Sequence, residues 1–220
     1  MDTQIAGIAE ANGWFGAWEQ TTVKELKMTK AKSPRVIAES DRLILREFTA
    51  ADLDDLAPIL ADPEVMRFSV GGPFTRQNTA EFLSRCQVEY QRLGFWLWAV
   101  VHKKDRKLIG YSGLLEQFLD GQREIEVAYR LATAYWGQGL GTEAARLARD
   151  AAFRLGFKRV ISLIEPANIA SIRVAEKNGL RYEKDTVYHH LSVRVYALEI
   201  SSEPGVLSGK SNMENFLQEL

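Results

Sequence analysis

Three glycines on alternate positions constrain this chain more than any other feature. Gly137, Gly139 and Gly141 lie between a strand-like alternating segment, 124–131, and an alanine-rich amphipathic segment that begins near Leu140. A helix start leaves its first backbone N–H groups without partners and carries the positive end of the helix dipole. Glycines let a bulky anion approach those donors. The order of strand, glycine loop and helix therefore predicts a phosphate-binding loop at a helix N-terminus.

The hydrophobic patterns elsewhere predict one α+β domain. Strand patterns occur at 42–48, 95–101, 107–118, 124–131, 158–164 and 181–198, and helical spacing occurs at 53–60, 76–93, 140–155 and 168–178. The order β–α–α–β–β–β–α–β–α–β places an antiparallel meander ahead of one parallel β–α–β crossover at the glycine loop. We therefore expect a mixed, mostly antiparallel twisted sheet with helices on both faces.

The two ends of the chain differ from this domain in their composition. The length of 220 residues suggests one domain with extensions. Residues 1–39, apolar and then basic, are expected to form an N-terminal extension, and 199–220 a polar C-terminal tail. The domain itself is then 40–198. Met28, shortly before that domain, is a second candidate for the start of translation.

Composition excludes several classes of function. The formal net charge of −1 argues against a nucleic-acid partner, and the absence of any run of about 18 apolar residues argues against a membrane span. Cys86 is the one cysteine, so one chain cannot build a disulfide framework. With one cysteine and three histidines, the sequence predicts no metal site. We expect a cytoplasmic protein.

Three classes of phosphate site compete for the glycine loop. A P-loop needs a lysine directly after its last glycine, whereas Thr142 follows Gly141 here. A dinucleotide-binding loop needs its third glycine where Thr142 stands, although Glu165 lies about where a ribose-binding acid would. Residues 132–136 also separate the strand from the glycines, which weakens the dinucleotide interpretation. Acyl-coenzyme A binding is the third class, and the motifs around the loop favour it.

Two motifs carry a resemblance to a known family. Residues 124–144 read EIEVAYRLATAYWGQGLGTEA, and residues 168–180 read NIASIRVAEKNGL. Both resemble the acetyl-CoA-binding motifs of GNAT N-acetyltransferases, most closely those of the RimJ/RimL-type ribosomal-protein acetyltransferase branch. The opening DRLILR at 41–46 is similar as well. The resemblance covers roughly 40–198.

The resemblance implies a GNAT fold with acetyl-CoA as the cosubstrate. Backbone N–H groups of the glycine loop would hold the pyrophosphate, and the preceding strand would pair its backbone with the pantetheine arm. Trp136 stands where the general family signature has arginine or glutamine, which is the form typical of the RimJ/RimL branch. The cofactor-binding residues implied are Val127, Tyr129, Leu131, Trp136, Gly137, Gln138, Gly139, Leu140, Gly141, Thr142 and Asn168.

Acetyl transfer to an amine needs a proton acceptor for the amine and a group that stabilises the leaving thiolate. Glu126 is the candidate base, acting through water, because the resemblance places a functional glutamate at this position. The alternative is a solvated carboxylate on the strand face or an ion-pair partner. Ser171 resembles the serine that this branch can use near the leaving sulfur. Ala175 stands where many GNAT enzymes have a tyrosine acid, so Ser171 or water would serve in its place. Asn168 either caps its helix alone or also hydrogen-bonds the pantetheine.

The sequence thus predicts an N-acetyltransferase that transfers an acetyl group from acetyl-CoA to a primary amine in a ternary complex. The acceptor is a protein N-terminus or a small molecule, and the enzyme is a monomer or a homodimer without a nucleic-acid or membrane partner. The alternative is a non-catalytic module that binds an acyl-CoA or a dinucleotide.

Overall fold

A single sheet organises the part of the chain that the computed structural model describes, residues 33–200. Its strands are β1 (Val36–Glu39), β2 (Leu43–Arg46), β3 (Leu97–His102), β4 (Lys107–Leu119), β5 (Gln122–Leu131), β6 (Arg159–Ile164), β7 (Arg181–Tyr188) and β8 (Leu191–Glu199). They are ordered β1-β2-β3-β4-β5-β6-β8-β7, and within 33–200 the β5–β6 pair alone is parallel. The mixed, mostly antiparallel sheet expected from the sequence is confirmed.

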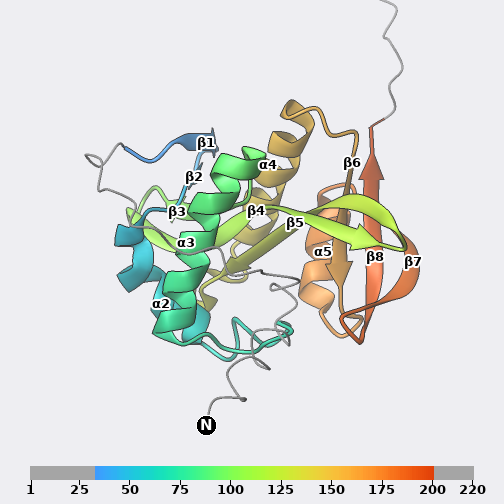
Figure 1. The fold of residues 1–220 in the computed structure, drawn as a ribbon, viewed down its shortest axis with the longest axis horizontal. Helices are drawn as coiled ribbons and strands as arrows, with labels where there is room; N and C mark the ends of the chain where they lie inside the picture. Colours follow the sequence, from blue (N-terminus) through green and yellow to red (C-terminus); the bar gives the residue numbers. More distant parts are fainter. Residues whose placement is uncertain (1–32, 201–220) are drawn as a thin grey trace, which may run out of the picture.

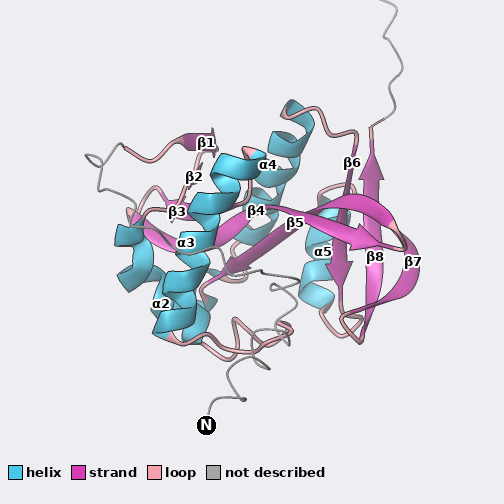
Figure 2. Ribbon diagram, viewed as in Figure 1, coloured by secondary structure: helices cyan, strands magenta, loops and turns pink. Residues whose placement is uncertain are grey.

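Helices cover both faces of this sheet, as predicted. They are α2 (Leu53–Ala61), α3 (Arg76–Leu93), α4 (Leu140–Arg154) and α5 (Ile169–Lys177), with short 3₁₀ turns at Ala50–Asp52 and Thr133–Tyr135. On α3, Phe82 packs against Tyr111 of β4, whose ring centroid is 5.6 Å away. Tyr111 pairs in register with Arg130 of β5, so α3 covers the face of the sheet on which these two side chains lie. Tyr129 lies on the opposite face of β5, where its ring is close to Gly141 at the start of α4. Figures 1 and 2 show α2 beside α3 at one end of the sheet and α5 beside β6 at the other.

Local sequence signals set the ends of α3 at the predicted positions. The Thr75 hydroxyl accepts a hydrogen bond from the Asn78 backbone N–H at 3.1 Å, which satisfies one of the donors that a helix start leaves free. At the other end, Gly94 adopts a left-handed conformation with φ of +79°. Glycine tolerates that conformation without a Cβ clash, so the helix ends there.

Gly110 marks a β-bulge or irregularity in the pairing of β3 with β4. This residue has φ of +145°, and the β3–β4 register shifts between Val100 and Val101 opposite it. A Cβ on Gly110 would lie 2.0 Å from the Arg130 carbonyl oxygen, and a Cβ on Gly113 would lie 2.3 Å from the Trp96 carbonyl oxygen. Both glycines let neighbouring strands approach closely.

Two features of the strands were less fully predicted. β1 was not expected, and the sheet therefore begins at Val36, ahead of Ser40. The strand pattern at 181–198 corresponds to two strands, β7 and β8. His189 and His190 turn the chain between them, with φ of 46° and 66°. Residues 1–32, with the alternative start at Met28, and 201–220 lie outside the described residues.

The parallel pair β5–β6 opens the sheet at its centre. β4 and β5 stay paired from Gly110 with Leu131 to Leu119 with Gln122, whereas β5 and β6 share one registered pair, Glu126 with Ile161. Beyond Glu126 the two strands separate. Their divergence exposes the edge of β5 next to the start of α4.

Within 33–200, no helix is both long and apolar enough to cross a membrane.

Candidate active site

A cavity of about 650 Å³ lies over the start of α4. Nine of the residues predicted to bind the cofactor line it: Tyr129, Leu131, Trp136, Gly137, Gly139, Leu140, Gly141, Thr142 and Asn168. Val127 lines a different cavity, described below. Gln138 lines neither of the two, because its side chain turns back and donates to the Ala134 carbonyl oxygen at 3.0 Å. The structure thus gathers most of the predicted cofactor residues around one space.

The glycine loop turns the chain sharply into α4. Gly137 and Gly139 have φ of +73° and +77°, and Gly139 is the N-cap residue of the helix. An L-residue with a side chain would be strained at either position. Arg42 holds the loop from outside: its Nη1 donates to the Gln138 carbonyl oxygen at 2.9 Å, and its Nε donates to Glu143 Oε2 at 2.7 Å. The first turn of α4 therefore faces the cavity in a fixed orientation.

Three cations also line this cavity and were not singled out from the sequence. Arg67, Arg173 and Lys177 form no ion pair with another residue of the described part, and Glu64 is the acidic residue of the lining. A helix N-terminus with several unneutralised cations nearby suits a ligand that carries more than one phosphate. The i, i+4 spacing of Arg173 and Lys177 on one face of α5 was a signal that could have revealed them.

The exposed edge of β5 offers few free carbonyl groups to a ligand. The Val127 carbonyl oxygen accepts from Ser162 Oγ at 3.1 Å, and the Leu131 carbonyl oxygen accepts from Trp136 Nε1 at 2.7 Å. Both carbonyls point to the β6 side, and by the alternation of a strand the Tyr129 carbonyl does so too. The Trp136 indole thus occupies a carbonyl oxygen at the edge of β5, which explains a tryptophan at this position of the loop.

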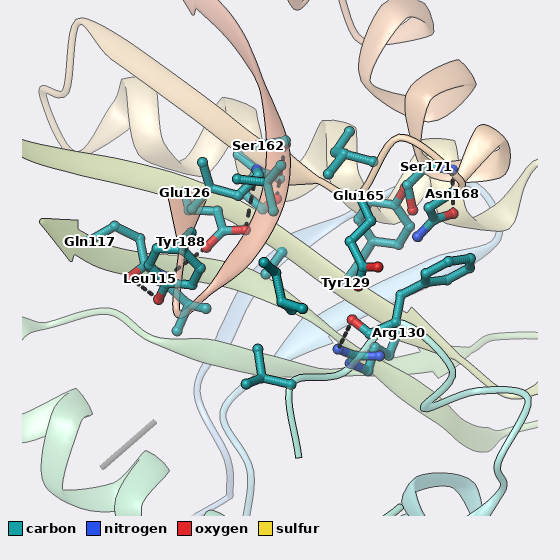
Figure 3. Close-up of a pocket in the computed structure, with 18 of the residues that line it drawn as sticks. Leu115, Gln117, Glu126, Tyr129, Arg130, Ser162, Glu165, Asn168, Ser171 and Tyr188 are labelled. Carbon is teal, nitrogen blue, oxygen red and sulfur yellow. Dashed lines mark hydrogen bonds between the residues drawn. The ribbon is translucent and has the colours of Figure 1, made fainter. Parts of the chain in front are cut away.

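A second cavity, of about 230 Å³, lies on the other side of the opening between β5 and β6. Its lining shares Phe68, Tyr129, Arg130, Asn168 and Ser171 with the first cavity. These shared residues mark the place where the two spaces meet. Figure 3 shows Tyr129, Ser171 and Asn168 together in one part of this cavity, and Glu126 with Gln117 and Tyr188 in another. A molecule in one cavity can therefore meet a molecule in the other at Tyr129 and Ser171.

Glu126 lines the second cavity, with a neutral amide as its main hydrogen-bond donor. Gln117 Nε2 donates to Glu126 Oε2 at 2.7 Å, and Tyr188 Oη donates to Gln117 Oε1 at 2.7 Å. The Leu163 N–H lies at the long distance of 3.5 Å from Glu126 Oε1. Burial raises the pKa of Glu126 to about 7, against the smaller lowering by Gln117. A carboxyl with that pKa suits a general base near neutral pH.

Arg130 has a structural role that the sequence did not reveal. Its Nε donates to Tyr111 Oη at 2.7 Å, and its two Nη groups donate to the carbonyl oxygens of Val65 at 3.1 Å and Phe68 at 3.4 Å. These bonds tie the segment between α2 and α3 to β5. Phe68 lines both cavities, so Arg130 fixes part of the wall at their junction.

At the junction, Asn168 caps α5 as predicted. Its Oδ1 accepts from the Ser171 backbone N–H at 3.1 Å. Ser171 places its side chain next to Tyr129, and it lowers the pKa of the phenol, which burial raises more strongly to about 12. The Tyr129 hydroxyl oxygen is buried beside the Ser171 side chain, outside the geometry of an ordinary hydrogen bond. The resemblance implied a cofactor contact through the backbone of Tyr129 and no role for its hydroxyl.

Glu165 lines the second cavity, not the one over the glycine loop. A dinucleotide whose pyrophosphate lay at the start of α4 would need its ribose-binding acid in the first cavity. The position of Glu165 therefore gives no support to the dinucleotide interpretation.

Within 33–200, the structure has no group of three or more histidine, cysteine or acidic side chains that could hold a metal ion.

Comparisons with known proteins agree with this geometry. Residues 42–181 match the family model described as the acetyltransferase (GNAT) domain. YkkB of Bacillus subtilis, an uncharacterized protein, is 35% identical over 159 residues, which cover 71% of this chain and 92% of YkkB. The uncharacterized N-acetyltransferase p20 of Bacillus licheniformis is 28% identical over 152 residues, with 66% of this chain and 82% of p20 covered.

Solved structures share the fold at low sequence identity. A GNAT-family acetyltransferase from Bacillus anthracis has a TM-score of 0.63 at 24% identity, with 73% of this chain and 96% of that chain covered. RimL, a ribosomal L7/L12 alpha-N-protein acetyltransferase solved with coenzyme A, has a TM-score of 0.62 at 17% identity, with 77% and 100% covered. The family match over residues 42–181 and the identity to YkkB show that this chain belongs to the GNAT acetyltransferase family.

Proposed function

We propose that this protein is an acetyl-CoA-dependent N-acetyltransferase in which Glu126 is the base and a primary amine is the acceptor. One observation carries the proposal: a cavity suited to a multiply phosphorylated donor meets a second cavity that contains a carboxyl with a pKa of about 7. The two spaces join at Tyr129 and Ser171. A ternary complex needs two sites that meet at the reacting atoms.

The first cavity would hold the acetyl-CoA. Its pyrophosphate would lie at the start of α4, where backbone N–H groups of the glycine loop and the helix dipole favour an anion. Arg67, Arg173 and Lys177 supply cations for the phosphates. The pantetheine arm would run along β5 towards the junction, with Asn168 beside it. RimL with coenzyme A and the microcin C7 self-immunity acetyltransferase MccE with acetyl-CoA are related folds whose ligands support this choice.

The chemistry would follow from the position of Glu126. Its carboxylate accepts a proton from the acceptor ammonium through water, which leaves a neutral amine. The amine nitrogen attacks the thioester carbonyl carbon, the C–S bond breaks with its electron pair on the sulfur, and the second proton of the nitrogen passes through water to that sulfur. Ser171 lies at the junction, where that sulfur would be. The products are an acetylated amine and coenzyme A.

The acceptor class has two candidates. The motifs resemble the RimJ/RimL branch, and the solved RimL acts on a protein N-terminus by its name, so protein N-termini form the first class. Small-molecule amines form the second, and a cavity of about 230 Å³ with aromatic walls from Phe68, Trp96 and Tyr188 suits a compact amine. Both classes present the same reacting group to Glu126.

Release of free thiol from acetyl-CoA with a panel of peptides and small amines tests the proposal. We expect release that depends on an acceptor and on Glu126, with the acetylated product identified by mass spectrometry. Tight coenzyme A binding without transfer to any acceptor of the panel would favour a non-catalytic module. Saturable binding of a nicotinamide dinucleotide, measured by its fluorescence, would favour the other cofactor.

A further inference from the structure

Tyr188 reaches the candidate base through one intervening amide. Its hydroxyl donates to Gln117 Oε1 at 2.7 Å, and Gln117 Nε2 donates to Glu126 Oε2 at 2.7 Å. Figure 3 shows the three side chains together in one part of the second cavity. Tyr188 ends β7 and lies 71 residues beyond Gln117 in the sequence. The strand β7 therefore adds a group to the surroundings of Glu126 that the β4–β5 hairpin alone does not supply.

Packing fixes the position of the Tyr188 ring. The ring lies against a small apolar cluster whose buried members, Leu119, Ile161 and Val195, come from three other strands. Tyr188 is also the last residue of β7, next to the turn into β8. The fold itself therefore sets the direction in which the Tyr188 hydroxyl meets the Gln117 amide, without any contribution from a bound molecule.

The Gln117 amide can stand in two orientations, and these suit opposite forms of Glu126. In the observed orientation an N–H group faces a carboxylate oxygen, which favours the ionised form. In the reversed orientation the amide oxygen would face Glu126 and would need a proton from it, which favours the neutral acid. The orientation of this one amide thus decides whether its hydrogen bond helps or hinders ionisation of the carboxyl.

The Tyr188 hydroxyl distinguishes between these two orientations. The observed amide offers its oxygen to the phenol O–H group. The reversed amide would offer an N–H group instead, and the O–H group would lose the acceptor that it has in the described part of the chain. Burial raises the pKa of Tyr188 to about 12, so the phenol keeps its proton wherever Glu126 titrates. Donation by the phenol also strengthens the next hydrogen bond along the chain.

We propose that Tyr188 is a positioning residue for Glu126, because its hydroxyl holds the Gln117 amide in the orientation that supports the carboxylate. Tyr188 acts through Gln117, since its hydroxyl donates to that amide and not to Glu126. The role of Glu126 as the base rests on the proposed function, whereas the chain of hydrogen bonds does not. The consequence for catalysis is a base that ionises at a lower pH than it would beside an unheld amide.

Other titratable groups surround these three side chains. The same cavity is lined by Arg85 from α3, Tyr111 and Glu116 from β4, Tyr129 and Arg130 from β5, and Glu165 from the segment after β6. From the β7–β8 turn, the His189 ring packs on the Tyr188 ring with centroids 4.2 Å apart. The charge of Arg130 lowers the pKa of Glu126 less than the Gln117 hydrogen bond does. All of these groups are retained in the variants compared below.

The protonation of Glu126 can be followed without any substrate. Glutamate labelled with carbon-13 at the carboxyl carbon gives an NMR signal for each side chain, and Glu126→Gln identifies the signal to follow. We expect a midpoint of about pH 7 in the wild-type protein. Tyr188→Phe should raise the midpoint by about half a pH unit, and Gln117→Leu by about one. Tyr182→Phe, on the same strand and outside both cavities, is the matched control and should leave the midpoint unchanged.

The double variant separates an effect through Gln117 from a direct one. Because Tyr188 acts through Gln117, Tyr188→Phe should add nothing to the midpoint of Gln117→Leu. An equal upward shift in both backgrounds would mean that Tyr188 acts on Glu126 directly and would overturn the inference. An unchanged midpoint in Tyr188→Phe alone would overturn it as well.

The same titration keeps the inference apart from the proposed function. A protein that acetylates no amine of the panel but shows these shifts would lose the proposed function and keep the role of Tyr188. If Tyr188→Phe does not fold, 3-fluorotyrosine at position 188 replaces it. That phenol is a stronger donor, so the midpoint of Glu126 should fall, and no change would count against the inference.

Discussion

Gln117 Nε2 donates a 2.7 Å hydrogen bond to Glu126 Oε2 across the β4–β5 hairpin. The same Gln117 side chain accepts from Tyr188 Oη at 2.7 Å, which fixes the amide with its nitrogen towards Glu126. The carboxyl therefore has an oriented neutral donor in place of an ion-pair partner. Its pKa stays at about 7, because the burial that raises it exceeds the lowering by this hydrogen bond.

Removal of the Gln117 amide should shift the pH dependence of catalysis. Gln117→Leu deletes the donor that lowers the pKa of Glu126, so the carboxyl would titrate at a higher pH. We expect the midpoint of the rising limb of kcat/KM to move up by about one pH unit. The measurement is kcat/KM against pH at a fixed amine concentration. Gln122→Leu, exposed at the start of β5, is the control, and an equal midpoint in both variants would show that Gln117 does not tune the base.

The partly buried carboxyl of Glu126 should also make stability depend on pH. Its pKa is about 7 in the folded protein, against an ordinary value of 4.5 for glutamate, so between these pH values the folded state binds more protons than the unfolded state. The free energy of unfolding therefore falls as pH rises through this window.

Replacement of the carboxyl removes that dependence. We expect the free energy of unfolding of Glu126→Gln, taken relative to that of the wild-type protein, to increase by up to about 3 kcal/mol as the pH rises from about 4.5 to 8. Urea denaturation of both proteins at the two pH values measures the difference. The same stability difference between variant and wild type at both pH values would mean that the folded-state pKa of Glu126 is not raised.

Arg42 should control the affinity for acetyl-CoA without taking part in the chemistry. It binds the Gln138 carbonyl oxygen and pairs with Glu143, whose carboxylate lies in the first turn of α4. Arg42→Ala would loosen the loop and leave that negative charge close to the pyrophosphate. We expect KM for acetyl-CoA to rise about tenfold with little change in kcat, as measured by steady-state kinetics.

A second substitution separates the effect of Arg42 on the shape of the loop from its effect on the charge of Glu143. In the Arg42→Ala background, Glu143→Gln removes the unpaired charge and should recover part of the affinity. Arg76→Ala breaks the exposed pair with Asp54 and serves as the control, since neither residue lines a cavity. No recovery in the double variant would assign the whole effect to the shape of the loop.

The fold could be predicted well where local signals carry it. The ends of α3 follow from Thr75 and Gly94. β1 was missed because Val36–Glu39 is a four-residue edge strand with no clear alternation. A strand of that length is specified mainly by its partner β2, which local sequence does not reveal.

The candidate site was predicted where a motif carries it and missed where contacts are distant in sequence. The glycine loop and the cap at Asn168 have local signatures, and the structure gathers them around one cavity. Gln117 could have been predicted as a neighbour of Glu126. The hairpin turn fixes the β4–β5 register, which places both side chains on one face of the sheet, two residue pairs apart. Tyr188 could not have been predicted, because it reaches Gln117 from 71 residues away through the packing of β7.

The pH dependence of acetyl transfer by the wild-type protein and by Glu126→Gln tests the role of Glu126 as the base most directly. We expect wild-type kcat/KM to rise with unit slope below about pH 7, because Glu126 must be ionised. Glu126→Gln should lose that limb and about 100-fold or more of its turnover, while calorimetry shows coenzyme A affinity within a few-fold of wild type. Wild-type turnover and an unchanged limb in Glu126→Gln would contradict the assignment of Glu126 as the base.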